Sequence, residues 1–322
     1  MVSKEIVGKR IAAYRIKCGL TQAQLGEKVY VSTQAVSKWE MGGAIPGIDV
    51  LLHLSQLFGC SINDLIEENR LIEQISIKPW SLKDGIYLYM DDQEYNCHWA
   101  KYISDNEIVR KNWLKFQWKS SETDVGKFVA EHSGVILEIG IGPGGGFVPS
   151  ILHKASDRSI IISDLSPTIV REWRNLLEIQ KGFHNLSFSA FNFCDIPFQN
   201  DCIDIITDGG GINNTIMGNK RKAYSECFRV LKPGGILISG GGMISKAEEQ
   251  SLPLALQEEI RNLFPGCLDS DYDSLLEIGF SKVETVVTHG WDTKDDISDI
   301  ATLALKYDSN IRFTGYIRYC YK

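Results

Sequence analysis

A glycine-rich turn between a β-rich run and a helical run constrains this chain more than any other feature. Residues 135–152 read VILEIGIGPGGGFVPSIL. Glycines permit a tight turn and close approach of a ligand to the backbone, and the following helix start offers unpaired N–H groups. Gly140, Gly142 and Gly145 also fit the G-x-G-x-x-G pattern of dinucleotide folds, so the glycines alone leave the type of nucleotide ligand open.

After residue 134 the chain alternates between β-rich and helical runs. The expected strands are Val135–Ile139, Ser159–Ser163, Leu186–Phe193, Ile203–Thr207 and Ile236–Ser239. The expected helices are Phe147–Lys154, Pro167–Ile179 and Lys220–Leu231. Such alternation predicts a parallel sheet covered by helices. Two further β-rich runs, Lys282–Thr288 and Phe313–Tyr321, lie near the end.

An acidic residue stands in or directly after each of the first three expected strands. Glu138 precedes the first glycine by two residues, where a negative charge would repel a pyrophosphate but suits an ammonium or a sulfonium. Asp164 ends the second strand, where a carboxylate can accept both ribose hydroxyls. Asp195 follows the third strand and is placed to accept from an adenine amino group, or to bond its own backbone as a loop residue.

From about residue 98 to residue 322 the chain resembles the class I S-adenosylmethionine-dependent methyltransferases. The resemblance rests on ExGxGxG, on the aspartate after the second strand, on CDIPF, on DCIDIITDGGG and on CFRVLKPGGILIS. It implies an α/β Rossmann-like domain whose seven-stranded sheet is mostly parallel and ends in an antiparallel hairpin, made by the last two β-rich runs. It also implies S-adenosyl-L-methionine as the cofactor.

The resemblance further implies a role for each matching residue. The methionine moiety would be held by Glu138, Gly140, Gly142 and Gly144. The nucleoside would be held by Asp164 at the ribose, Leu165 on the adenine ring, and the Cys194 backbone with Asp195 at the adenine edge.

Transfer from a sulfonium is an in-line displacement that depends mainly on orientation, with a general base where the acceptor is a hydroxyl or an ammonium. The candidates for catalysis are His98, Tyr102, Asp208 and His289, with Asn213 and Asn214 to orient an acceptor. For each histidine a structural role is the more common one, and the asparagines could simply form a turn. DGGG stands in place of the DPPY-type motif of DNA amino-methyltransferases, and no Pro-Cys pair follows. The sequence therefore favours a small-molecule acceptor.

The beginning of the chain has short amphipathic helical runs. Thr21–Val29 and Ser32–Glu40 would form two helices joined by a short turn, each opened by a capping hydroxyl. The apolar residues that would lock them together are Leu25, Val29, Val36 and Trp39. The second helix is left with outward polar side chains, as a helix-turn-helix needs for the major groove.

Residues 5–67 resemble the phage-repressor (XRE, Cro/repressor-type) domain through TQ, VS-KWE-G-P and LFGCSINDL. The resemblance implies an all-α five-helix domain that binds double-stranded DNA. The expected contacts are Gln22 and Ser32 to phosphates and Thr33, Gln34, Ser37 and Lys38 near base edges. Gly26 stands where the family usually has Ala, and Tyr30 where a Gly is frequent. A packing module that has lost DNA binding is the alternative.

Charge and composition divide the chain in the same way. The net charge of the whole chain is −7. Residues 1–60 hold 7 basic and 4 acidic residues, a net charge of +3, which leaves a net charge of −10 for residues 61–322. We expect a helix-turn-helix domain at residues 1–68, a linker at 69–97 and the methyltransferase domain at 98–322.

Eight cysteines without a CxxC pair predict reduced thiols and no metal site. Neither a signal peptide nor a membrane span is recognisable, so a cytoplasmic protein is expected.

Two functions fit these patterns. The first is a small-molecule methyltransferase joined to a DNA-binding domain. The second is a transcriptional regulator whose methyltransferase-like domain senses S-adenosylmethionine or another ligand without turnover. A third interpretation, an NAD-dependent oxidoreductase, rests on the glycine pattern alone. Because such DNA-binding domains usually read two half-sites, a homodimer is expected.

Overall fold

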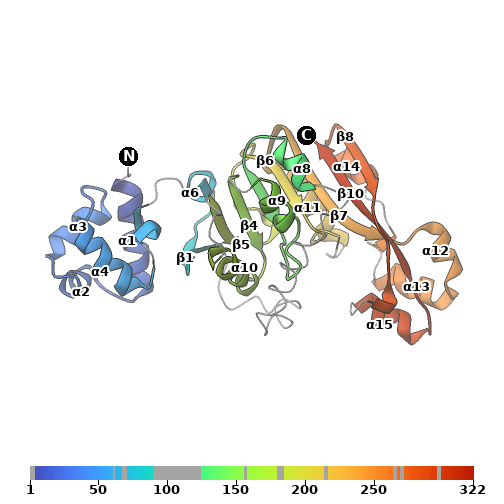
Figure 1. The fold of residues 1–322 in the computed structure, drawn as a ribbon, viewed down its shortest axis with the longest axis horizontal. Coiled ribbons are helices and arrows are strands. Elements are labelled where there is room, and N and C mark those ends of the chain that lie inside the picture. Colours follow the sequence, from blue (N-terminus) through green and yellow to red (C-terminus); the bar gives the residue numbers. More distant parts are fainter. Residues whose placement is uncertain are drawn as a thin grey trace. The chain divides into compact units, whose positions relative to one another are not determined.

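The computed structural model describes residues 4–60, 62–66, 71–89, 125–155, 158–179, 185–213, 217–263, 267–268, 272–295 and 299–322. The chain forms two compact units (Figure 1). The first comprises Met1–Ile75 and Pro79–Tyr89, and the second comprises Ser76–Lys78 and Met90–Lys322. Among the described helices, none is long and apolar enough to cross a membrane.

The first unit begins with a bundle of five helices, as predicted. They are α1 (Lys4–Lys17), α2 (Gln22–Lys28), α3 (Thr33–Glu40), α4 (Ile48–Phe58) and α5 (Ile62–Ile66). The side chains that close its core include Val7, Ile11, Leu25, Val36, Trp39, Leu54 and Leu65, all buried. Tyr14 of α1 stacks on Phe58 of α4 with ring centroids 5.4 Å apart. The apolar spacing read from the sequence therefore does form one core.

A short helix and a hairpin complete the first unit. These are α6 (Leu71–Ile75), β1 (Ser81–Lys83) and β2 (Ile86–Leu88), with β1 and β2 antiparallel. The hairpin turns at Asp84 and Gly85, both at positive φ, as a two-residue turn of this kind requires. Glu73 of α6 accepts from Arg10 of α1 at 3.3 Å and from the Tyr87 hydroxyl at 2.5 Å. These elements fall within the range 69–97 that the sequence analysis assigned to a linker.

In the second unit, seven strands lie side by side in the order β5-β4-β3-β6-β7-β10-β8. The strands are β3 (Ile136–Ile139), β4 (Ile160–Asp164), β5 (Leu186–Ala190), β6 (Ile203–Asp208), β7 (Leu231–Met243), β8 (Lys282–Val287) and β10 (Arg312–Tyr321). The first five strands in this order are parallel, and β10 is antiparallel to both β7 and β8. The predicted mostly parallel sheet with an antiparallel terminal hairpin is confirmed.

The helices α9 (Val148–Lys154), α10 (Pro167–Ile179) and α11 (Met217–Val230) connect successive parallel strands (Figure 1). A short 3₁₀ turn, Phe193–Asp195, lies between β5 and β6, whereas α8 (Val125–Ala130) precedes β3 and α14 (Tyr272–Ile278) precedes β8. The central strands are buried on both faces, which explains their almost unbroken apolar sequences.

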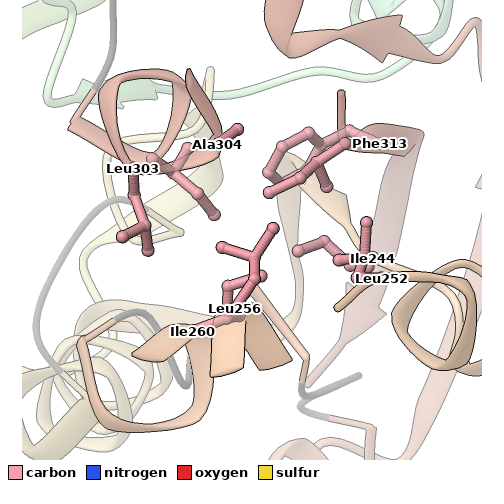
Figure 2. Packing of buried hydrophobic residues seen from close by; sticks show 9 residues of the cluster. Ile244, Leu252, Leu256, Ile260, Leu303, Ala304 and Phe313 are labelled. Carbon is pink, nitrogen blue, oxygen red and sulfur yellow. The ribbon is translucent and has the colours of Figure 1, made fainter. Parts of the chain in front are cut away.

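A second hydrophobic cluster lies beyond the parallel part of the sheet. It joins the end of β7 and the start of β10 to α12 (Lys246–Ser251), α13 (Leu254–Leu263) and α15 (Asp299–Lys306). Its buried members include Ile244, Leu252, Leu256, Ile260, Leu303, Ala304 and Phe313 (Figure 2). Nearby, β9 (Trp291–Asp292) pairs with β10 and is followed by the 3₁₀ turn Thr293–Asp295. The sequence analysis assigned no structure to this insertion.

Candidate functional sites

The glycine-rich turn lies between β3 and α9, at the carboxyl end of the central strand. Four of its glycines, Gly140, Gly142, Gly145 and Gly146, have positive φ between 51° and 88°. A Cβ at Gly146 would overlap the carboxylate of Glu138, whereas a Cβ at Gly144 would meet no atom within 4 Å. Side chains are therefore excluded on the inner side of the turn, and its outer side is open.

Glu138 is fully buried beneath this turn. Its carboxylate accepts from the Thr207 hydroxyl at 2.5 Å, from the Phe147 N–H at 3.3 Å and from the N–H of Gly209. Burial raises the pKa of this carboxyl well above its usual value. The side chain thus joins β3, the start of α9 and the loop after β6, and its predicted contact with the methionine moiety stays a prediction.

Asp164, at the end of β4, contacts the glycine-rich turn directly. Its carboxylate accepts from the Gly142 N–H and from the Ser166 N–H, each at 2.9 Å. Burial raises the pKa of Asp164 to about 6. The neighbouring Leu165 is half-buried. The structure therefore brings together two residues that the sequence predicts to hold the cofactor, although 22 positions separate them.

The predicted adenine-edge residues lie in the turn after β5. The Cys194 N–H is bonded to the side chain of Asn192 at 2.9 Å, and the Cys194 thiol lies 3.4 Å from the Asn219 carbonyl. Asp195 is exposed and pairs with Lys78. Asn192 and Lys78 belong to no predicted site, and only their place in the folded chain reveals these contacts.

Of the predicted catalytic residues, the structure describes Asp208, Asn213 and His289; Asp208 ends β6, and Asn213 lies in the loop that follows. Asp208 is fully buried and accepts from the N–H groups of Gly210 and Ile212 and from the Ser239 hydroxyl. Burial raises its pKa to about 6. The structure therefore gives Asp208 a role in holding its own loop, and its role as a base stays a prediction.

Asn213 is tied to the two neighbouring strands. Its amide donates to the Gly242 carbonyl at 3.2 Å, and its carbonyl accepts from the Tyr316 hydroxyl at 3.0 Å. His289 is exposed and far along the chain in the segment before β9. The other proposed residues, His98, Tyr102 and Asn214, lie outside the described residues.

Three buried carboxylates thus lie in or at the carboxyl ends of the neighbouring strands β3, β4 and β6. Glu138, Asp164 and Asp208 pair with N–H and hydroxyl donors, and among the described residues none of them has a lysine or arginine partner. A cationic ligand bound beside these carboxyls would lower their raised pKa values and favour their ionised form. Among all residues that the structure describes, no group of three or more His, Cys, Asp or Glu side chains could hold a metal ion.

The candidate DNA-binding surface is the outer face of α3. Ser32 caps this helix, since its hydroxyl accepts from the Ala35 N–H at 3.2 Å. Thr33, Gln34 and Lys38 are exposed and Ser37 is half-buried, whereas Val36 and Trp39 face the core. All of the residues proposed for base edges therefore lie on the helix that the motif assigns to the groove.

Glu40, at the end of α3, connects the two helices of the motif, α2 and α3, to α1. It accepts from Arg15 of α1 at 2.6 and 3.0 Å and from the Gln22 amide at 2.8 Å. Gln22, predicted to contact a phosphate, is thus held by Glu40 through its side chain. Tyr30, in the turn, has φ of +60° and is exposed.

Two models of known protein families match this chain. Residues 11–65 match the family model described as helix-turn-helix, and residues 137–239 match the model described as methyltransferase domain. The chain therefore carries a helix-turn-helix domain and a methyltransferase domain. S-Adenosylmethionine is the cofactor of that class of domain.

Individual relatives match one domain at a time. The C-methyltransferase UbiE of ubiquinone/menaquinone biosynthesis from Marinomonas sp. is 32% identical over 143 residues, which is 43% of this chain and 53% of that protein. The HTH-type transcriptional activator BcrR of Enterococcus faecalis is 34% identical over 82 residues, 26% of this chain and 40% of that protein. The chain thus spans about half the length, or less, of these curated relatives. A solved structure, the YcgJ protein of Bacillus subtilis, has 16% identity and a TM-score of 0.42, covering 61% of this chain and 97% of that one.

Proposed function

We propose that this protein binds double-stranded DNA through its first unit and transfers a methyl group from S-adenosylmethionine to a small molecule in its second. The observation that carries the methyltransferase part is the set of three buried carboxylates around the glycine-rich turn, with no cationic partner among the described residues. A sulfonium with an ammonium supplies the missing positive charge, whereas the pyrophosphate of a dinucleotide would add negative charge.

The residues of the second unit fit S-adenosylmethionine in chemistry as well as in charge. The carboxylate of Asp164 accepts from the N–H groups of Gly142, Ser166 and Leu165, and the acceptor capacity that its two oxygens still have suits a ribose hydroxyl. The open outer side of the turn at Gly144 permits close approach of a ligand to the backbone. Half-buried Leu165 would lie against the adenine ring, and exposed Asp195 would accept from its amino group.

The bound cofactor would supply the activated methyl group. The protein's own part is to orient the reactants, which can lower a barrier by roughly 7–11 kcal/mol. Asn213 lies beyond β6 with both ends of its amide held by Gly242 and Tyr316. It would present a fixed polar group beside the methyl-transfer position.

A calorimetric titration of S-adenosylmethionine into the full-length protein and into Asp164→Ala tests the cofactor part. We expect binding to the wild type and its loss in the variant. A folded wild type that binds no cofactor would refute the methyltransferase proposal.

Incubation with labelled cofactor and pools of small molecules from the host then tests for an acceptor. The UbiE relative is a C-methyltransferase by name, so small aromatic acceptors are the first to try.

The DNA-binding part rests on the polar outer face of α3 and the local charge of +3 over residues 1–60. Duplexes selected from a random pool would be bound by the wild type. Binding should be lost in Gln34→Ala/Lys38→Ala, because both side chains are exposed and neither supports the core. Selection of no duplex by the folded protein would refute DNA binding.

A second candidate function is a regulator that senses S-adenosylmethionine without turnover. It is favoured by the hydrogen bonds of Asp208 and Asn213, which are engaged in holding the loop after β6. The BcrR relative is a transcriptional activator by name. This function predicts intact cofactor binding without methyl transfer to any acceptor.

A further inference from the structure

Trp173, in the middle of α10, reaches back to the glycine-rich turn. Its indole N–H donates to the Gly142 carbonyl at 2.7 Å, and the side chain is fully buried. Its ring also fills the space beside Gly145, where a Cβ would lie 2.6 Å from the ring edge. No motif of the sequence singles this residue out, since an apolar side chain inside an amphipathic helix is usually part of the core.

The hydrogen bond from Trp173 fixes the one peptide of the turn that has no donor of its own. The carbonyl of Gly142 belongs to the bond with Pro143, and proline has no N–H. On its other side, the Gly142 N–H is held by Asp164 at 2.9 Å. Gly142 has φ of +53°, and glycine at such a position is otherwise free to change conformation.

Both anchors of Gly142 come from the same stretch of chain. Asp164 ends β4, and its carboxylate also accepts from Ser166, whose hydroxyl faces the Ile169 N–H at the start of α10. Trp173 follows two turns later on that helix. The segment 164–173 therefore holds Gly142 from both sides, and it carries the predicted ribose-binding carboxylate as well.

We propose that Trp173 is a positioning residue for S-adenosylmethionine binding. It keeps the Gly142 carbonyl directed away from the ligand side and keeps the turn open for the cofactor. The proposal rests on the cofactor binding inferred above. It assigns Trp173 no contact with the reacting atoms: it acts through Gly142.

The test compares full-length Trp173→Phe with the wild type by calorimetric titration of S-adenosylmethionine, at a temperature where both are folded by circular dichroism. Phenylalanine retains most of the ring and removes the N–H donor. Because one buried hydrogen bond is lost, we expect affinity to fall about fivefold to tenfold. Where an acceptor is available, KM for the cofactor should rise by the same factor with kcat unchanged.

Phe280→Leu is the matched control, because Phe280 is buried against Phe228 beside β8, away from the glycine-rich turn. It should lower the melting temperature and leave cofactor affinity within about twofold. A second variant places benzothienylalanine, an isostere of tryptophan without the N–H, at residue 173. It should bind as weakly as Trp173→Phe.

Each result decides a different point. Equal affinity of wild type and Trp173→Phe would overturn the inference and leave the proposed function standing. Wild-type affinity in the benzothienylalanine variant would show that ring packing, not the hydrogen bond, matters, which also overturns it. Absence of binding to the wild type would overturn the proposed function, and the inference with it.

Discussion

Tyr30 occupies a backbone conformation that favours glycine. Its φ is +60°, and its side chain is 86% exposed, with one edge-on ring contact to His53 at 6.2 Å. Left-handed backbone costs a non-glycine residue roughly 1–2 kcal/mol. We therefore expect Tyr30→Gly to raise the free energy of unfolding of the first unit by about 1 kcal/mol, after part of the gain is offset by the flexibility of glycine.

Gly59 provides the opposite substitution in the same unit. It ends α4 at φ of +66°, and a Cβ there would meet no atom within 4 Å. Gly59→Ala should therefore lower the free energy of unfolding by about 1 kcal/mol through backbone strain alone. Hydrogen exchange of the α2–α4 amides, read by mass spectrometry, measures both changes in the full-length protein. Changes of the same sign in both variants would contradict this explanation.

The pKa of Asp164 predicts how cofactor binding depends on pH. Burial raises this pKa from 3.8 to about 6. The ionised form is needed to accept the ribose hydroxyls, so affinity for S-adenosylmethionine should fall up to tenfold for each pH unit below about 6. Asp208 titrates in the same range, so Asp164→Asn is needed as a reference. Titrations between pH 5 and 8 should show a flatter dependence in this variant. Parallel curves would exclude Asp164 as the cause.

The same group affects stability with the opposite sign. A carboxyl whose pKa is higher in the folded state stabilises that state below pH about 4, and this contribution is lost as the pH rises through about 6. Between these values the free energy of unfolding of the wild type should decline relative to that of Asp164→Asn. Acid therefore favours the fold and disfavours the ligand at this residue.

At the scale of single residues, a contact could be predicted from the sequence only where the sheet topology alone determines it. Asp164 and Gly142 follow adjacent parallel strands, whose carboxyl ends meet at one edge, so their proximity could be predicted. The partners of Asp208 could not, since they depend on how its own loop bends back. Trp173 was missed because its spacing on α10 is that of an ordinary core residue.

At the scale of elements, two loops at the carboxyl edge of the sheet touch through their backbones. A Cβ at Gly209, after β6, would overlap Gly146, and one at Gly211 would lie 3.4 Å from the Gly140 Cα. Glu138 connects the same two loops from below. Gly209→Ala must push them apart, which costs about 1–3 kcal/mol of stability and weakens cofactor binding. Thermal unfolding and calorimetric titration measure the two effects.

Gly144→Ala is the control for this substitution. Its Cβ would meet no atom within 4 Å, and its φ is not positive. The melting temperature should therefore stay the same, whereas affinity should fall if the cofactor lies over the outer side of the turn. If neither Gly209→Ala nor Gly144→Ala lowers the affinity for the cofactor, the cofactor binds away from these two loops.

The elements themselves were predictable where periodicity is long and regular. The five helices of the first unit and the sheet of the second follow from such patterns. The hairpin of β1 and β2 has three-residue strands, too short for a periodic pattern, although Asp84-Gly85 is a turn signal that could have revealed it. The hydrophobic cluster around α13 and α15 joins segments about 40 residues apart. The sequence of one segment therefore does not indicate that it packs against the other.

At the scale of the whole molecule, one chain joins a unit suited to a polyanion with one suited to a cationic ligand. The helix-turn-helix region has +3 over residues 1–60, and the remainder has −10. The DNA affinity of such a protein should fall steeply with salt, because binding releases counterions from phosphates. Affinity for S-adenosylmethionine involves buried groups and should respond far less.

Thermodynamic linkage separates the two candidate functions. If the cofactor changes DNA affinity by some factor, DNA must change cofactor affinity by the same factor. A regulator requires a factor of about 5–150, whereas an enzyme that is merely tethered to DNA allows a factor of one. Fluorescence anisotropy of a selected duplex with and without S-adenosylmethionine gives the factor by which the cofactor changes DNA affinity. Titration of the cofactor with and without the duplex gives the factor by which DNA changes cofactor affinity. The coupling should vanish in Asp164→Ala, the variant expected to lose cofactor binding, and Gln34→Ala/Lys38→Ala should bind the cofactor normally. A cofactor effect on DNA binding that persists in Asp164→Ala would mean that the ligand acts outside the glycine-rich site.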